Sequence, residues 1–154
     1  MTRLIDGAHI VSLAEGLISA KKQQGPFALD LTARHVSRVE SGGALDFGGS
    51  EFREASATAL DPEKKLPDEP YGWWNLGPGT YLIAFNETVK SAGRGLVLVF
   101  PHSRLLAAGA WHASAVVDTL DRDFRMPLHV GHAGLAIKQN ARVSRAIVLA
   151  EVLP

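Results

Sequence analysis

Hydrophobic residues follow two different periods along the chain, and the change of period divides it into two parts. The apolar positions of residues 8–22 recur at the spacing of one helical face: Ile10, Leu13, Ala14, Leu17 and Ile18. Asp6 precedes this stretch as a candidate N-cap, and Gly25-Pro26 follows it as a stop signal. The pattern predicts one N-terminal amphipathic helix over residues 8–22.

After residue 26 the apolar residues alternate with polar ones or form short runs, as expected for β-strands. The runs are FALDLT, GTYLIAFNETV, GLVLVF, SAVVD, PLHV, GLAIK and RAIVLAEVL. Glycine, proline and asparagine separate them at the spacing of a β-sandwich or barrel. We therefore predict a mainly β, antiparallel, jelly-roll-like body. The polar and charged segment from Glu51 to Pro70 is predicted to be a surface loop.

Composition narrows the class of protein. The chain has 154 residues, which suits a single domain over 1–154. Basic and acidic residues number 16 each, so no overall charge favours a nucleic acid or an acidic membrane as partner. Cysteine is absent, and no signal peptide or membrane-spanning run is found. We expect a soluble, cytoplasmic protein.

Two arrangements of polar residues are candidates for chemistry of their own. The residue types of a hydrolytic triad are present: Ser103, His102 or His112, and Asp118. No G-x-S-x-G turn presents the serine, which argues against a triad. His129 and His132 have a possible metal-ligand spacing, but without a carboxylate nearby two surface histidines explain them better.

Aromatic and basic residues offer two further candidates. Trp73 and Trp74 precede a turn and have the chemistry to stack on a base or a sugar, although packing explains such a pair more often. Arg104, Arg142 and Arg145 each lie beside an apolar strand. If the sheet brings them together they form an anion site, and otherwise they are edge-strand charges.

The order of short motifs along the chain is more informative than any one of them. In chain order they are ALDLT (28–32), LGPGTYLIAFNETV (76–89), PHSRLLAAGA (101–110), AVVD (115–118) and KQNARVSRAIVLAEV (138–152). In this order and spacing the chain resembles the dUTPase and dCTP deaminase superfamily, most closely its archaeal-type members. The resemblance implies a distorted jelly-roll or β-clip-like fold, a homotrimer, and a deoxynucleoside triphosphate substrate that carries Mg²⁺ on its phosphates.

The resemblance also implies a set of phosphate-binding residues. The family's central motif reads P-R-S-S-L-L-R-x-G, and here His102 replaces the first arginine, Ser103 is kept, and Arg104 replaces the second serine. Ala107 replaces the last arginine. Near the C-terminus Arg145 replaces the glutamine of the family's G-x-R-I-A-Q segment. We expect His102, Ser103, Arg104 and Arg145 to bind substrate, with altered donors.

Asp118, in AVVDTLDRDFR, is similar in place to the family's catalytic aspartate, which orients the attacking water. Phe124 is implied as the aromatic platform that packs on the deoxyribose. The deaminases of the superfamily need a glutamate about ten residues after the aspartate, and position 128 is a leucine. Deamination is therefore the weaker of the two enzymatic interpretations.

Three functions remain open from the sequence. The first is a dUTPase-like hydrolase that converts dUTP to dUMP and pyrophosphate, with Asp118 as the base. The alternative is a catalytically silent trimer of the same fold that binds nucleotides or serves a structural role. A third is a jelly-roll module that binds a metal or a sugar through its histidines and tryptophans.

Overall fold

Strands are the main secondary structure of the computed structural model, which describes residues 1–91 and 93–151. In chain order the elements are β1 (Thr2–Leu4), α1 (Gly7–Ser12), β2 (Ala14–Glu15), α2 (Ala20–Gln23), β3 (Leu29–Ser41), β4 (Ser56–Ala59), β5 (Trp73–Leu76), β6 (Gly79–Phe85), β7 (Thr88–Lys90), β8 (Gly95–Pro101), α3 (Ser103–Ala107), β9 (Ala110–Trp111), β10 (Ala115–Val117), β11 (Thr119–Leu120), β12 (Arg125–Val130), β13 (Leu135–Lys138) and β14 (Arg142–Glu151).

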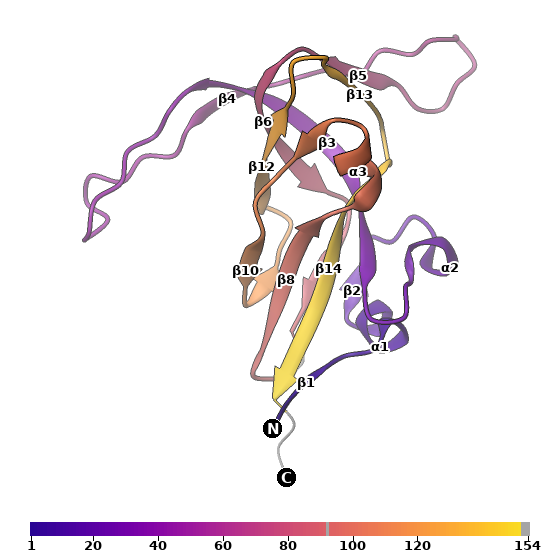
Figure 1. Ribbon diagram of the computed structural model, residues 1–154, viewed down its shortest axis with the longest axis vertical. Helices are drawn as coiled ribbons and strands as arrows, with labels where there is room; N and C mark the ends of the chain where they lie inside the picture. Colours follow the sequence, from indigo (N-terminus) through magenta and orange to yellow (C-terminus); the bar gives the residue numbers. More distant parts are fainter. Residues whose placement is uncertain (92, 152–154) are drawn as a thin grey trace.

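The strands pair antiparallel throughout the described part of the chain. The largest sheet has the order β10-β8-β14-β3-β6-β12-β9, with β1 added to β14 and β4 added to β3. Two smaller sheets, β11-β7-β2 and β13-β5, complete the body. Figure 1 shows β8 and β14 side by side along the length of the body. The prediction of a mainly β, antiparallel fold is confirmed.

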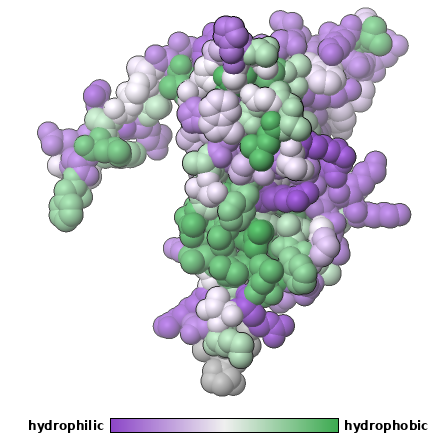
Figure 2. All heavy atoms as spheres, viewed as in Figure 1, coloured by the Kyte–Doolittle hydropathy of each residue, from purple (hydrophilic) through white to green (hydrophobic). Residues whose placement is uncertain are grey.

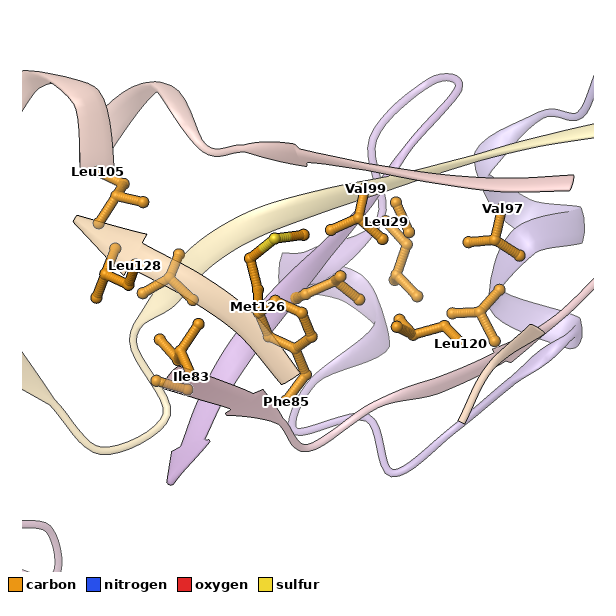
Figure 3. Close-up of a cluster of buried hydrophobic side chains, with 14 of the residues drawn as sticks. Leu29, Ile83, Phe85, Val97, Val99, Leu105, Leu120, Met126 and Leu128 are labelled. Atoms are coloured by element: carbon orange, nitrogen blue, oxygen red, sulfur yellow. The ribbon is translucent and has the colours of Figure 1, made fainter. Parts of the chain in front are cut away.

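The core lies on the concave side of the curled sheet. Val97 and Val99 of β8 and Leu29 of β3 are fully buried, and Figure 3 shows them packed with Phe85 and Met126 from β6 and β12. Inward residues alternate with outward ones along β8 and β14, as the period of a strand requires. Burial of this apolar cluster is the main term that holds the sheet closed.

The single helix predicted over residues 8–22 is wrong. The structure has two short helices there, α1 and α2, and between them β2 pairs with β7. Gly16 turns the chain with a φ of +78°, and a Cβ atom at this position would lie 2.3 Å from the carbonyl oxygen of Asn86. Strand pairing therefore overrides the helical period. The N-cap prediction is confirmed, because Asp6 Oδ1 accepts a hydrogen bond from the His9 backbone N–H at 3.0 Å.

The predicted surface loop from Glu51 to Pro70 contains a strand. β4 pairs with the outer half of β3, and together they form an arm that projects from the body (Figure 1). The sequence of β4 is SATA, which has no large apolar residue, so it lacks the apolar–polar alternation by which a strand is predicted from sequence. The remainder of the segment is mostly exposed, as predicted.

The C-terminal end of the predicted strand RAIVLAEVL, residues 152–153, lies outside the described residues. In the part of the chain that the structure describes, no helix has the length and apolar character to cross a membrane. The extent of a single domain over 1–154 stays a prediction.

Candidate functional site

A buried carboxylate gathers three basic side chains where β3, β8 and β14 meet. Asp30, on β3, is only 7% exposed. Its Oδ1 accepts a hydrogen bond from Arg145 Nε at 3.0 Å. Its Oδ2 lies 3.3 Å from Arg142 Nη1 and 3.3 Å from His102 Nε2. Asp30, His102, Arg142 and Arg145 are referred to below as the Asp30 cluster.

The register of β14 explains why these residues meet. Arg145 lies opposite Asp30 on β3 and opposite Phe100 on β8. His102 follows directly after β8, and its backbone N–H donates to the carbonyl oxygen of Val143 at 3.0 Å. Backbone pairing thus holds together three segments that are far apart in the sequence, and this pairing brings their side chains into contact.

The ring of His102 is fixed from both sides. Its Nδ1 accepts a hydrogen bond from the Arg104 backbone N–H at 3.0 Å, which caps α3. The neutral ring therefore carries its proton on Nε2, which donates to Asp30. Burial lowers the pKa of His102; Asp30 opposes this shift, and Arg145 and Arg142 reinforce it. His102 is thus a neutral, 4% exposed part of the structure at pH 7.

Ser103 and Arg104 lie in the first turn of α3 and are exposed. Arg104 lines a pocket of about 360 Å³ together with Trp73, Lys138 and Arg142. Arg142 therefore borders both this pocket and the Asp30 cluster. Ser103 and Arg104 are neighbours of the cluster in sequence, but among the described residues neither side chain hydrogen-bonds to it.

Asp118 lies away from the Asp30 cluster. It is an exposed residue between β10 and β11, beside the start of β8, because Val117 pairs with Val97. It lines a pocket of about 480 Å³ together with Arg94 and Leu96. His102 follows the other end of β8, and the five residue-to-residue steps from Leu96 to Pro101 correspond to about 17 Å of strand. One copy of the chain does not bring the predicted base to the predicted phosphate ligands.

Phe124 is half-buried in the turn that leads into β12. Its ring stacks on Phe85 with the centroids 6.3 Å apart and the planes inclined by 19°. Asp121 closes this turn, because its Oδ1 accepts from the backbone N–H groups of Asp123 at 2.9 Å and Phe124 at 3.0 Å. Phe124 packs at the margin of the core, and its role as a deoxyribose platform stays a prediction.

A second polar network, centred on Glu87, is hydrogen-bonded to the backbone of Asp30. Glu87, which is 1% exposed, accepts hydrogen bonds from Gln23 Nε2 at 2.7 Å, from the Thr32 backbone N–H at 2.8 Å and from Thr32 Oγ1 at 2.5 Å. Gln23 Nε2 also donates to the carbonyl oxygen of Asp30 at 2.9 Å. Burial raises the pKa of Glu87, and these donors oppose the rise. Glu87 is therefore a structural carboxyl.

Asp30 is the site residue that the sequence prediction missed. The available signal was a carboxylate between two leucines in ALDLT, since a buried acid needs a basic partner. Of Arg104, Arg142 and Arg145, which all lie beside apolar strands in the sequence, the structure brings Arg142 and Arg145 together at Asp30. Asn140, just before them, has a φ of +64°, a left-handed conformation that asparagine tolerates.

The triad is not assembled. His112 Nε2 lies 2.7 Å from Ser144 Oγ, and its Nδ1 lies 2.8 Å from the carbonyl oxygen of Ala113. His112 and Ser144 are both buried, so this pair offers no exposed nucleophile. Burial lowers the pKa of His112, which keeps it neutral as a structural residue. Ser103 and Asp118 lie elsewhere.

The other candidates pack as side chains of the body. His129 stacks on Trp111 at 5.8 Å, and no group of three or more potential ligands that could hold a metal ion occurs within residues 1–91 and 93–151. Trp74 is buried and donates to the carbonyl oxygen of Leu60 at 2.9 Å. Lys65 covers the ring of Trp73 at 3.9 Å. Leu128, at the position of the deaminase glutamate, is a core residue.

Comparisons with known proteins agree with the order of the motifs. No family model matches the sequence. A probable deoxyuridine 5′-triphosphate nucleotidohydrolase of Methanosarcina mazei is 31% identical over 137 residues, which are 88% of this chain and 77% of that protein. The protein of the same name from Methanosarcina acetivorans is also 31% identical over 137 residues, with the same coverage of 88% and 77%.

A solved structure shares the fold. The 2′-deoxycytidine 5′-triphosphate deaminase from Agrobacterium tumefaciens superposes with a TM-score of 0.63 at 12% sequence identity. The match covers 97% of this chain and 49% of the deaminase chain, so this protein spans about half the length of that structure. At this identity the likeness concerns the fold alone.

Proposed function

Because the chain belongs to the family of deoxyuridine 5′-triphosphate nucleotidohydrolases, or dUTPases, we propose that it hydrolyses dUTP to dUMP and pyrophosphate. The observation that carries the proposal is the Asp30 cluster, which gathers two arginines and a histidine from the segments that resemble the family's phosphate-binding motifs. Deamination has no comparable support, since Leu128 is buried in the core.

Arg145 is the principal ligand for the substrate phosphates. Its Nε is held by Asp30, while 46% of its side chain remains exposed. One edge of the guanidinium is thus anchored, and the rest is available for a phosphate oxygen. His102 acts on Arg145 as a positioning residue through Asp30, since His102 Nε2 lies 3.3 Å from Asp30 Oδ2 while Asp30 Oδ1 accepts from Arg145 Nε. Ser103 and Arg104 add exposed donors beside it.

Asp118 accepts a proton from the attacking water while the water oxygen forms a bond to the α-phosphorus. The bond from that phosphorus to the oxygen that bridges to the β-phosphorus breaks, and pyrophosphate leaves. The length of β8 between Asp118 and the cluster requires that Asp118 comes from a second copy. We therefore propose a homotrimer in which each site joins the Asp30 cluster of one copy to Asp118 of the next.

An uncovered apolar surface supports this assembly. The outward residues of β1, β8, β10 and β14 form the apolar sheet face: Leu4, Leu96, Leu98, Val116, Ile147 and Leu149. Val116, Leu98 and Ile147 lie in one row across the sheet. Figure 2 shows a continuous hydrophobic patch over this part of the body. A strand that is apolar on both faces is normally covered on both, and Asp118 lies at the edge of this face.

Mg²⁺ is proposed to arrive on the substrate phosphates. The carboxylate of Asp30 is already shared among three basic groups, so it is not a free ligand for a cation. Asp118 is an exposed carboxylate that can reach the ion directly or through water. When bound, the ion neutralises phosphate charge and polarises the bond that breaks.

A cytoplasmic location stays a prediction.

One observation favours the silent alternative. His102 stands where the family motif has an arginine, and it is buried with both ring nitrogens engaged. It offers the substrate no donor, so hydrolysis depends on Arg145 taking over that role. If Arg145 does not, the protein is a nucleotide-binding or structural trimer.

The test is pyrophosphate release by the purified protein with Mg²⁺ and each deoxynucleoside triphosphate in turn. We expect turnover of dUTP and its loss in Asp118→Asn, with the matched exposed variant Asp68→Asn unaffected. Light scattering on the same samples reports the assembly. An intact trimer that releases no pyrophosphate from any of these substrates would establish the silent alternative.

A further inference from the structure

A second group of arginines surrounds a pocket farther along β3. Arg34, Arg122 and Arg125 line it together with His35 and Asp123, and its volume is about 310 Å³. This site is referred to below as the arginine pocket. No member of the Asp30 cluster lines it. Arg34 lies four residue-to-residue steps along β3 from Asp30, which corresponds to about 13 Å of extended chain.

A β-bulge builds one wall of the pocket. Between Ala33 and His35 the pairing of β3 with β6 shifts, so Arg34 is the extra residue. Arg34 Nε donates to the carbonyl oxygen of Phe85 at 3.0 Å, and its Nη2 donates to the carbonyl oxygen of Arg122 at 2.9 Å. The Arg34 side chain is therefore pre-positioned, and it ties the turn before β12 to β3.

Strand pairing sets the opposite wall. His35 and Arg125 both lie opposite Ala84, one on each side of β6. Arg122 and Asp123 come from the turn between β11 and β12. Leu82, Ala84 and Ala59 provide the apolar part of the lining, and Ser37 adds a hydroxyl. The pocket thus has charged walls over an apolar floor, where a charge interacts more strongly than in open water.

The charges of this pocket are not balanced by the protein. Within the described residues, none of the three guanidinium groups lies within 4.0 Å of a carboxylate. Asp123 is the one acidic residue of the lining, so three positive charges and one negative charge leave a formal charge of +2 with His35 neutral. Burial lowers the pKa of both Arg34 and His35, and repulsion from Arg122 and Arg125 lowers both further.

We propose that the arginine pocket binds a small phosphate anion, either inorganic or carried on a nucleotide. Guanidinium groups recognise phosphate oxygens through pairs of charge-assisted hydrogen bonds, and several of them converge here. The volume lies at the lower end of the range for ligand pockets, about 300–1,000 Å³, which suits a compact ligand. The site goes beyond the proposed hydrolysis, because Asp118 and the Asp30 cluster take no part in it.

His35 reports occupancy without any substitution. A phosphate bound beside it adds negative charge and raises the pKa of its imidazole, against the lowering by Arg34, Arg122 and Arg125. NMR titration of the His35 ring, with and without sodium pyrophosphate and in the absence of Mg²⁺, should show that rise. Parallel titrations with orthophosphate and with dUMP separate a site for the free inorganic anion from one for a nucleotide phosphate. An unchanged His35 titration with all three probes overturns the proposal.

Variants locate the binding in the full-length protein. Arg122 and Arg125 are exposed, so Arg122→Gln/Arg125→Gln removes charge without disturbing the anchored Arg34. We expect pyrophosphate affinity at this site to fall by at least about tenfold, since each charge-assisted hydrogen bond contributes about 1.5–3 kcal/mol. Arg53→Gln on the arm and Arg145→Met in the Asp30 cluster should leave the His35 response unchanged. An equal response in the double variant, or its loss in Arg145→Met, contradicts the assignment.

Discussion

Arginines gather at two places along β3, and their surroundings differ. In the Asp30 cluster, a buried carboxylate contacts Arg142 at 3.3 Å and Arg145 at 3.0 Å. In the arginine pocket no described carboxylate lies within 4.0 Å of Arg34, Arg122 or Arg125. Asp30 anchors Arg142 and Arg145 and offsets part of their charge, so the exposed part of Arg145 meets a ligand in a fixed geometry. The arginine pocket has no such carboxylate and keeps more of its charge for a ligand.

The two sites also differ in how they respond to losing a charge. Removing the carboxylate from the Asp30 cluster leaves two guanidinium groups and a buried imidazole without their shared acceptor. Removing an arginine from the arginine pocket relieves repulsion among like charges. Neutralising a charged side chain should therefore lower the free energy of unfolding at the Asp30 cluster and raise it at the arginine pocket.

The largest effect is expected for Asp30→Asn. The free energy of unfolding should fall by about 2–3 kcal/mol, which is less than for a fully buried pair because water reaches Arg142 and Arg145. Urea denaturation measures the change. The matched control is Glu40→Gln, an exposed acid on the same strand, which should stay within about 0.5 kcal/mol. Equal losses in both variants would mean that the cluster is not a structural ion pair.

Arg145→Met should have the next largest effect, on activity. We expect kcat/KM for dUTP to fall at least about tenfold, because the variant removes the guanidinium and keeps much of the apolar stem. Arg125→Gln, from the arginine pocket, is the control and should leave kcat/KM unchanged. A similar fall in both variants would remove the functional distinction between the two sites.

A pH dependence should follow from the buried residues His102 and His112, whose pKa values are lowered in the folded state by burial. The unfolded chain binds more protons below the ordinary histidine pKa of about 6.5, so stability should be lost as the pH falls below it. Each histidine contributes at most about 1.4 kcal/mol per pH unit.

Unfolding free energies at pH 7.5, 6.5 and 5.5 test the share of His102. His102→Asn keeps an N-cap for α3, because the amide oxygen can accept from the Arg104 backbone N–H. This variant should show a flatter dependence on pH. Ser103→Ala, the exposed neighbour, should behave as the wild type. An unchanged slope in His102→Asn would show that burial does not hold His102 neutral.

The smallest effect is expected for Arg125→Gln. The free energy of unfolding should rise by about 0.5 kcal/mol, because one of the like charges around Arg34 is removed. Thermal unfolding in a buffer without phosphate measures it, and Arg53→Gln on the arm is the control. A loss of stability would mean that Arg125 has a favourable partner and that the arginine pocket is not strained by charge.

Much of this fold could be predicted from the sequence, and each of the two exceptions has its own physical cause. β6, β8 and β14 alternate or run apolar in the way that strands do, so their period is visible. Residues 8–22 have a helical period, but β7 offers β2 a pairing partner that a single sequence does not reveal. The arm was hidden because β4 contains only small and polar residues.

The candidate site could be predicted only in part. The local frame of proline, leucine and glycine in residues 101–109 singled out His102 and Ser103, and the segment after Asn140 singled out Arg145. The structure brings His102 and Arg145 together at Asp30, and the substrate-binding roles stay predictions. Asp30 and Arg34 depend on register, since one lies opposite β14 and the other sits in a bulge. A shift of pairing by one residue changes which side chains meet, and no local pattern encodes it.

The central claim is that Asp118 of one copy completes the Asp30 cluster of another, and a mixing experiment tests it most directly. Asp118→Asn and Arg145→Met are each expected to be inactive as homotrimers. After joint unfolding and refolding at equal amounts, random assembly should restore about one quarter of the sites. Activity near that level is the predicted result. A mixture no more active than its parents, with trimers reformed, would contradict a shared site.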